Sequence, residues 1–308
     1  MSKIPIKVIH HGRYHPLEHL GGVETFARNL GLVFEEVTFT TPSTLDPEQV
    51  ERERLPVICD NQTVLDWHEG IPLIGFQHGV AAVKVTHTKS RTDRRLARDQ
   101  AEASQRRGTL WVACAEWISH TFEQLHGNGA EHVVYHQVDV SRFDGRLTGE
   151  APRLILHDAR SEHKGKRLIR HLARTFPEWR FEGLSCEPQE VPDRMRKARA
   201  FLHLSRYEGN SIVCNEAMAM DLPCMFTRVG LMQDERGPSE VHVIDPVRAF
   251  DDQDYVAEQF RLFVASLDER ELHPRRWVLE NAGPEPNLAA WQRVIRSWQE
   301  LSGWDAGI

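Results

Sequence analysis

The sequence predicts an α/β protein of two doubly wound domains, each a parallel sheet covered by helices on both faces. Short apolar runs rich in valine and isoleucine alternate with helical stretches along the chain, which is typical of strands buried in a parallel sheet. The alternation stops at a polar segment with glycine and proline, residues 143–153, and then restarts. Such a segment is typical of a linker, and 308 residues suffice for two domains of ordinary size.

The first domain is expected to open with a buried strand at residues 6–12 and a helix at residues 21–34 that begins on two glycines. Five further strands are expected at residues 36–41, 55–61, 72–79, 110–115 and 132–138. Between the last two of these strands, residues 117–127 have a helical pattern. Strand and helix therefore alternate as a parallel sheet requires.

The second domain is expected to repeat this order. It starts with a strand at residues 153–159 and an amphipathic helix at residues 164–176. Later strands are expected at residues 179–184, 200–205, 223–229 and 241–246. Residues 211–221 are the helix between two of these strands, and residues 286–304 form an amphipathic helix with three tryptophans. We therefore expect domains at residues 1–147 and 148–285, followed by a C-terminal helix within residues 286–308.

Composition excludes several classes of protein. The net charge of −7 argues against a general nucleic-acid binder, because phosphate contacts need a basic surface. No apolar run approaches the roughly 20 residues that span a bilayer, and the start lacks a signal-peptide pattern. Five cysteines without a C-x-x-C pair indicate reduced thiols, so we expect a cytoplasmic protein. No metal site is expected, because no H-E-x-x-H or similar spacing occurs.

The stretch from Ser205 to Cys224 places one glutamate before a helix and another inside it. In an open parallel sheet, ligands bind beyond the carboxyl ends of the strands. The helix after the strand at residues 200–205, capped by Asn210 or Ser211, would attract an anion such as a phosphate to its N-terminus. Glu216 could then accept hydrogen bonds from a vicinal diol such as a ribose, and Glu208 from a sugar hydroxyl. The alternative is that both glutamates are solvated surface residues.

These residues resemble a known signature. Ser205–Gly209, Glu216–Ala219 and Leu222–Pro223 are similar to the E-x7-E signature of family 4 of the retaining glycosyltransferases. Other segments resemble that family in the same order: residues 21–30, 75–79, 112–125, 138–143, 158–169 and 227–235. The chain departs from the family pattern at Ala159 and Asp221, where glycine is usual, and in a shortened turn at residues 183–186.

The resemblance implies a fold and a set of roles. The fold would be GT-B, in which two Rossmann-like domains face a cleft, with the acceptor on the first domain and the donor on the second. The C-terminal helix would pack back on the first domain. The implied donor-binding residues are Glu216 for the ribose, Glu208 for the donor sugar, the amides of Gly209, Asn210, Ser211 and Ile212 for sugar and phosphate, Arg160 and Lys164 for the diphosphate, and Gly21 and Gly22 for close backbone approach.

Catalytic roles are implied for Glu208, Arg160 and Lys164, and for His78, which would face the reacting centre. Each has an ordinary alternative. Arg160 and Lys164 could be solvated loop residues, His78 a buried histidine satisfied by backbone groups, and the two glycines a turn before a helix.

The function predicted is transfer of a sugar from a nucleotide diphosphate sugar to an acceptor hydroxyl, with retention of anomeric configuration. Fixed cations and helix-end amides can stabilise the departing diphosphate without a metal, and the resemblance implies no cofactor. The acceptor would be a sugar, a lipid-linked molecule or a small molecule. Two alternatives remain open, a nucleotide-sugar epimerase on a GT-B fold and a non-catalytic nucleotide-sugar-binding protein.

A basic segment runs from Lys84 to Gly108. Five of its cations fall on or next to an expected helix: Lys89, Arg91, Arg94, Arg95 and Arg98. Either they form a solvated helix face with weak ion pairs, or they bind an anionic acceptor or the anionic membrane surface that carries it. The second reading adds peripheral contact with the inner face of the membrane to the expected cytoplasmic location.

Overall fold

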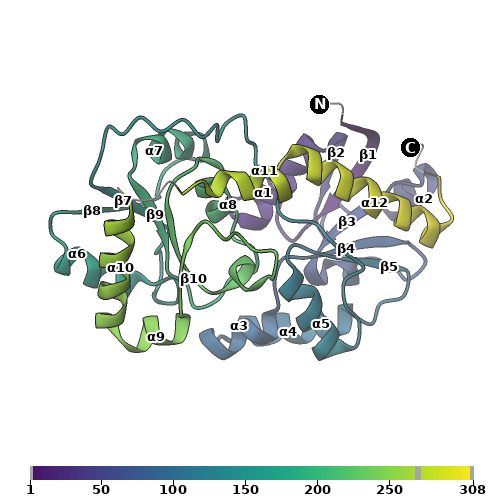
Figure 1. Cartoon of the computed structure of the whole chain (residues 1–308). Coiled ribbons are helices and arrows are strands. Elements are labelled where there is room, and N and C mark those ends of the chain that lie inside the picture. The colour runs from purple at the N-terminus through teal and green to yellow at the C-terminus, as the bar shows by residue number, and fades with distance from the viewer. Residues whose placement is uncertain (1–2, 268–271, 306–308) are drawn as a thin grey trace. The chain divides into compact units, whose positions relative to one another are not determined.

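The computed structural model describes residues 3–267 and 272–305 and contains two compact units. The first consists of Met1–Gln137 together with Asn281–Ile308, and the second of Val138–Glu280. The domain ranges expected from the sequence also include residues 1–2, 268–271 and 306–308, which lie outside the described residues. Each unit is an α/β structure with its own parallel sheet (Figure 1).

The first unit has a six-stranded sheet in the order β2-β1-β3-β4-β5-β6. Its strands are β1 Ile4–His11, β2 Phe34–Thr40, β3 Val57–Asp60, β4 Leu73–Gln77, β5 Thr109–Ala113 and β6 His132–Val133. Its helices are α1 Gly22–Asn29, α2 Pro47–Glu53, α3 Ala81–Thr88, α4 Arg91–Ala103, α5 Glu116–His126 and α12 Pro284–Ser302. All the strand pairs are parallel, so the loops that follow the strands share one edge of the sheet.

The second unit has a five-stranded parallel sheet in the order β11-β10-β9-β7-β8. Its strands are β7 Leu154–His157, β8 Arg180–Gly183, β9 Ala200–His203, β10 Cys224–Thr227 and β11 His242–Ile244. Its helices are α6 Lys166–Thr175, α7 Val191–Lys197, α8 Ile212–Ala219, α9 Pro246–Asp251, α10 Gln253–Ser266 and α11 Pro274–Asn281. Helices α6 and α10 pack against each other (Figure 1), with Leu168, Leu172, Phe260 and Phe263 buried in one apolar cluster.

Each strand expected from the sequence is present, and all but β6 differ from the expectation only at their ends. The expected helix at residues 21–34 is shorter, because α1 ends at Asn29 and a 3-10 turn over Leu30–Leu32 leads into β2. Phe34, fully buried, belongs to the strand and not to the helix. Strand β6 keeps two of the seven residues expected, and the chain after it stays buried without continuing the ladder.

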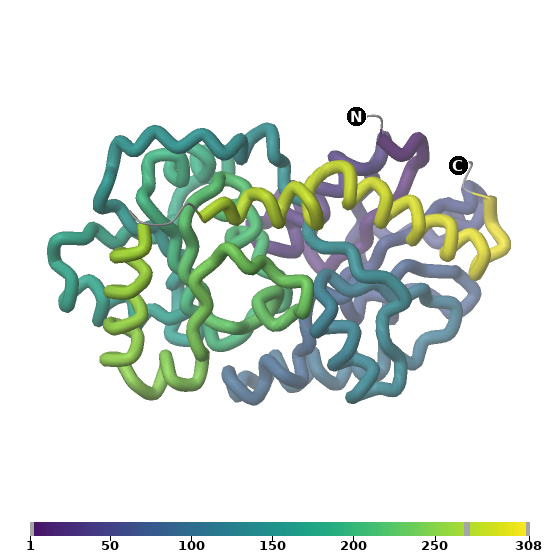
Figure 2. The backbone as a smooth tube through the Cα atoms, in the orientation of Figure 1, coloured from purple at the N-terminus to yellow at the C-terminus, as the bar shows by residue number. Residues whose placement is uncertain are grey.

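The last helix belongs to the first unit although it follows the second in sequence. Figure 2 shows α12, in yellow, beside segments of the N-terminal part of the chain, and it contacts β5 and β6. Trp291 stacks on Phe76 with ring centroids 5.8 Å apart, and the Trp298 indole N–H donates to the Pro72 carbonyl at 3.1 Å. Both tryptophans are essentially inaccessible to solvent. Within the described residues, no helix combines the length and the hydropathy that crossing a bilayer requires.

Candidate active site

Strand register brings two ionisable side chains together at the carboxyl edge of the second unit's sheet. His157 at the end of β7 pairs with Leu202 in β9, so the next residues, Asp158 and His203, lie side by side where the ladder ends. The Oδ2 atom of Asp158 is 3.5 Å from Nδ1 of His203. Both side chains are buried. Neither residue had a role predicted from the sequence.

Lys164 reaches this pair from a short 3-10 turn, Glu162–Lys164, after β7. The following residue, Gly165, has φ +80°, and a Cβ there would lie 2.2 Å from the Leu204 carbonyl oxygen. A side chain is therefore excluded by both the left-handed backbone and the close packing. The turn places Lys164 Nζ 3.7 Å from Asp158 Oδ2 and 2.5 Å from Glu208 Oε1.

Glu208 lies in the loop between β9 and α8. Its Oε1 atom accepts hydrogen bonds from Lys164 Nζ at 2.5 Å and from His203 Nε2 at 3.0 Å. The loop after β10 packs closely on Glu208, because a Cβ on Gly230, at φ +59°, would lie 2.8 Å from the Glu208 Cβ. Three loops of one sheet edge therefore fix the Glu208 side chain, which is largely buried.

Two carboxylates, a lysine and a histidine thus meet at this edge, and we call them the charged cluster: Asp158, Lys164, His203 and Glu208. Burial by itself would raise the pKa of Glu208, but His203 and Lys164 lower it to about 2. Burial would likewise lower the pKa of His203, but Cys214 and Glu208 raise it to about 10. The pKa of Lys164 is also raised, because Glu208 and Asp158 outweigh its burial. All three effects favour the charged forms.

Arg160 touches the charged cluster only at its rim. Its Nε atom is 3.4 Å from Asp158 Oδ1, while 76% of its side chain is exposed. Of the two predicted diphosphate ligands, Lys164 is therefore held inside the cluster and Arg160 extends from it into solvent.

Helix α8 begins directly after the Glu208 loop, as expected. Ser211 occupies the N-cap position, but its side chain makes no capping hydrogen bond. The Oδ1 atom of the neighbouring Asn210 accepts a hydrogen bond from Asn215 Nδ2, within the helix, at 3.0 Å. The capping expected of these residues is thus not seen at Ser211. Glu216 lies on the second turn of α8 and is half-buried, which differs from the solvated surface position of the alternative interpretation.

A small recess adjoins the charged cluster between the loops that follow β9 and β10. It is lined by His203, Glu208, Asn210, Ser211, Cys214, Asn215, Phe226, Thr227, Val229, Leu231 and Met232. The Oδ1 atom of Asn215 is buried there without a hydrogen-bond partner in the described part of the chain. A buried acceptor of this kind favours a ligand or a water that donates a hydrogen bond.

His78 lies in a separate polar network in the first unit. Its Nε2 is 2.7 Å from Asp60 Oδ1, and its Nδ1 is 3.1 Å from His136 Nε2. The same Asp60 oxygen is 3.0 Å from His10 Nε2. Burial alone would raise the pKa of Asp60, but His10 and His78 hold it well below its usual range. Both ring nitrogens of His78 therefore have side-chain partners and not the backbone partners of the buried-histidine alternative.

The remaining predicted residues also lie in the first unit. Gly21 is the N-cap of α1, and the Glu24 carboxylate lies so close that a Cβ on Gly21 would clash with it, whereas a Cβ on Gly22 would meet nothing. The basic residues Lys89, Arg91, Arg94, Arg95 and Arg98 are exposed at the end of α3 and along the first half of α4. Arg95 and Arg98 approach Asp99 at 3.6 and 3.7 Å.

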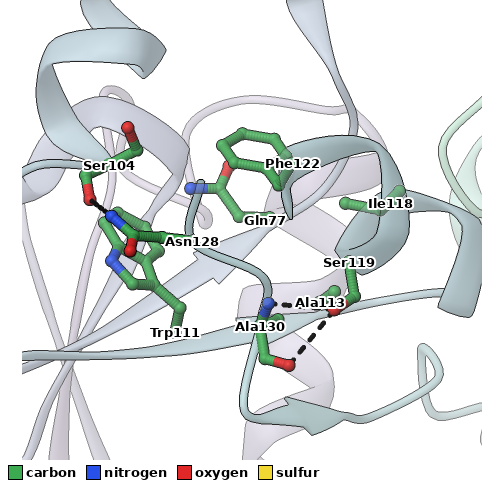
Figure 3. Close-up of a pocket in the computed structure, with 9 residues that line it drawn as sticks. All are labelled: Gln77, Ser104, Trp111, Ala113, Ile118, Ser119, Phe122, Asn128 and Ala130. Carbon is green, nitrogen blue, oxygen red and sulfur yellow. Dashed lines mark hydrogen bonds between the residues drawn. The ribbon is translucent and has the colours of Figure 1, made fainter. Parts of the chain in front are cut away.

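A second recess lies in the first unit, between β5 and α5 (Figure 3). Trp111, Ile118 and Phe122 make it mostly apolar. Its polar groups bond largely to one another: Asn128 Nδ2 donates to the Ser104 carbonyl, and the Ser119 hydroxyl bonds both backbone groups of Ala130. No acidic, basic or thiol group lines it, so we place no chemistry there. In the described residues, no group of three or more His, Cys, Asp or Glu is arranged to hold a metal ion.

The two parallel-sheet units have the fold of the GT-B glycosyltransferases, which confirms the predicted fold class. Residues 152–271 match the family described as glycosyl transferases group 1, a match that covers less than half of the chain. No curated protein sequence matches the chain.

Solved structures share this fold over nearly the whole chain. A sucrose-phosphate synthase from Thermosynechococcus elongatus has a TM-score of 0.71 at 14% identity, over 94% of this chain and 98% of that chain. Anabaena HepE, in complex with UDP and glucose, has a TM-score of 0.66 at 14% identity, over 95% and 100%. AviGT4, a glycosyltransferase of avilamycin A biosynthesis, has a TM-score of 0.60 at 16% identity, over 97% and 99%. At these identities the likeness concerns the fold.

Proposed function

We propose that the protein transfers a sugar from a nucleoside diphosphate sugar to an acceptor hydroxyl, with retention of anomeric configuration and without a metal ion. The observation that carries the proposal is the position of Glu208 and Lys164, bonded to each other at the start of α8. A cation, a carboxylate and a helix N-terminus at the carboxyl edge of a parallel sheet can hold the three parts of such a donor.

Each part of the donor has a matching group in the second unit. The first-turn amides of α8 and the Lys164 ammonium suit the diphosphate, with Arg160 reaching it from solvent. The Glu208 Oε1 atom is bonded to Lys164 and His203, which leaves Oε2 to accept a hydrogen bond from a sugar hydroxyl. Glu216, on the second turn of α8, would accept from the ribose hydroxyls. The resemblance to the E-x7-E signature supports this assignment.

Departure of the nucleoside diphosphate puts negative charge near Lys164 and Arg160. Fixed cations and amides stabilise such charge without reorganising during the reaction. The acceptor would attack the face that the diphosphate leaves, and the leaving phosphate would take the acceptor's proton. In this scheme no protein carboxylate forms a covalent bond to the sugar. His78, whose ring nitrogens contact Asp60 and His136, stays a predicted catalytic residue, and no step of this scheme depends on it.

HepE, with which the chain shares its fold, has been solved with UDP-glucose, so UDP-glucose is the first donor to test. Purified protein would be incubated with a panel of nucleotide sugars and simple acceptors, and the products separated. Release of free nucleoside diphosphate, or a glycosylated acceptor with the donor's anomeric configuration, is expected. A donor recovered with an altered sugar would indicate an epimerase. Binding of the donor without turnover would indicate a non-catalytic sensor. Either result would overturn the proposal.

A further inference from the structure

The His203 ring lies between the two carboxylates of the charged cluster, Asp158 and Glu208. Its Nδ1 faces Asp158 at 3.5 Å and its Nε2 bonds Glu208 at 3.0 Å, while its side chain is only 4% exposed. A neutral imidazole has one N–H and cannot donate to both carboxylates. An imidazolium donates to Glu208 and also turns an N–H, not a lone pair, toward Asp158, so the geometry fits the protonated ring.

Lys164 contacts the same two carboxylates, at 2.5 and 3.7 Å. If Lys164 were the sole cation there, moving it to a diphosphate would leave two buried carboxylates close together without compensation. Such a state is strongly disfavoured, since like charges at short range cannot both remain ionised in a buried site. If His203 is also a cation, Lys164 can move to the diphosphate while the positive charge of His203 still compensates the two carboxylates.

We propose that His203 is a positioning residue that stays protonated between Asp158 and Glu208 and thereby frees Lys164 for the diphosphate of the donor. This inference rests on the proposed function for the role of Lys164, but the charge of His203 is a property of the protein alone. In this role His203 would not contact the substrate. Its effect is to keep the Glu208 carboxylate ionised and oriented.

The surroundings of His203 are consistent with a charged ring. Asp158 faces the ring from the loop after β7, and Lys164 of the same loop lies on the Asp158 carboxylate. Glu208 faces it from the loop after β9 and Cys214 from α8, while Phe226 of β10 packs edge-on at 6.4 Å. Burial alone would favour the neutral ring, but Cys214 and Glu208 raise the pKa of His203 to about 10.

Nuclear magnetic resonance of protein labelled with 15N-histidine tests the charge directly, without any donor. At pH 8 one histidine should show both ring nitrogens protonated, when an unperturbed histidine is neutral. Loss of that signal in His203→Gln assigns it. If this variant does not fold, Phe226→Leu changes the ring packed against the imidazole without changing any charge, and shifts the same signal. A neutral His203 ring at pH 8 would overturn the proposal.

Titration with UDP separates this inference from the proposed function. The His203 ring should remain protonated when UDP is saturating, while the Lys164 ammonium signal moves. A ring that loses its proton on UDP binding contradicts the inference. Absence of UDP binding counts against the proposed function, and the measurement on the free protein still decides the charge of His203.

Kinetics then tests the positioning role. His203→Gln should lower kcat about tenfold or more, with the KM for UDP-glucose changed much less, because the contact is indirect. The acid limb of the pH profile should move up by about one to two units, since removing a cation raises the pKa of Glu208. His171→Gln, on α6 and outside the charged cluster, is the control. An unchanged acid limb in His203→Gln would show that the residue is only structural.

Discussion

The Oδ1 atom of Asp221 accepts a hydrogen bond from the backbone N–H of Arg275 at 3.1 Å. Asp221 itself adopts φ +59° just after α8, a conformation that usually selects glycine. Its other oxygen is 3.1 Å from Nδ1 of His273. The Asp221 carboxylate therefore accepts a hydrogen bond from a backbone N–H in the first turn of α11, although it lies more than fifty positions earlier in the sequence. This explains how the chain departs from the family's glycine at this position.

Asp221→Ala should destabilise the protein by about 1–3 kcal/mol, since it removes a cap and keeps a side chain in the left-handed region. Asp221→Gly should cost less, because glycine relieves the backbone strain while losing the cap. Urea unfolding of the two variants and the parent measures both effects. Equal losses for alanine and glycine would mean that the backbone conformation at this position carries no strain.

Glu216→Ala should weaken UDP binding by about 1.5–3 kcal/mol, the range for hydrogen bonds to a charged group. Glu216→Gln should lose less, because the amide oxygen still accepts one of the two bonds. Isothermal titration calorimetry with UDP measures the change. Glu258→Ala, on α10, controls for the loss of a surface charge. A UDP affinity in Glu216→Ala equal to that of the parent would remove Glu216 from the ribose site.

Replacing the two cations should separate their roles. Lys164→Ala should lower kcat by about a hundredfold or more and raise the KM for UDP-glucose much less, because the interaction strengthens as charge develops on the leaving group. Arg160→Ala should also lower kcat more than it raises KM, but by a smaller factor, since the Arg160 side chain is mostly exposed to solvent. EDTA should leave the turnover of the parent unchanged. Activity that EDTA abolishes and a divalent ion restores would argue against a metal-free reaction.

The exposed cations of α4 should bind anionic lipid if the basic face is functional. Replacing Arg91, Arg94, Arg95 and Arg98 with Gln should weaken sedimentation with vesicles of phosphatidylcholine and phosphatidylserine by about tenfold or more, since each basic residue near such a surface contributes about 1 kcal/mol. UDP binding should not change. The control replaces four exposed arginines of the second unit: Arg170, Arg174, Arg180 and Arg194. Equal sedimentation of both variants and the parent would leave the α4 face as solvated surface.

Stability should depend on pH at both ends of the scale. The pKa of Glu208 is lowered from 4.5 to about 2, so its contribution is present above pH 4.5 and is lost as the pH falls towards 2. The pKa of His203 is raised from 6.5 to about 10, so its contribution is present below pH 6.5 and is lost as the pH rises towards 10. Urea midpoints should thus fall from pH 6.5 to pH 10, less steeply in His203→Gln. Parallel curves for the two proteins would contradict this assignment.

The sequence predicted the sheets and the loop-to-helix site because those features are local. Apolar runs mark the strands, and the strand, Glu208 loop and α8 helix are contiguous in the chain. The charged cluster combines local and distant residues. Glu208 was predicted from its place in the loop before a helix, and Lys164 from the resemblance to a family. Asp158 and His203, by contrast, meet only because β7 and β9 are neighbours in register. The order of strands in a sheet is a tertiary property, and it decides which strand ends lie together.

Asp60 was missed for the same reason. Asp60 is the last residue of β3. His10 lies near the end of β1 and His78 directly follows β4, and these two strands are the neighbours of β3 in the sheet. A usable signal was present, because a carboxylate closing an apolar strand needs a partner when it is buried. Which partner it finds requires the strand order. The outcome for His78 also shows that a residue can match a motif and still have its ring nitrogens occupied by its neighbours.

The packing of α12 against β5 and β6 has a consequence for folding during synthesis on the ribosome. The unit that starts the chain depends on Trp291 and Trp298 from the chain's last helix, whereas the second unit is one uninterrupted segment (Figure 2). Domains generally fold as their residues emerge. The second unit can therefore be complete while the first still has an open apolar face over Phe76. Nascent chains that end before α12 should be cut by protease within the first unit and resist cutting in the second.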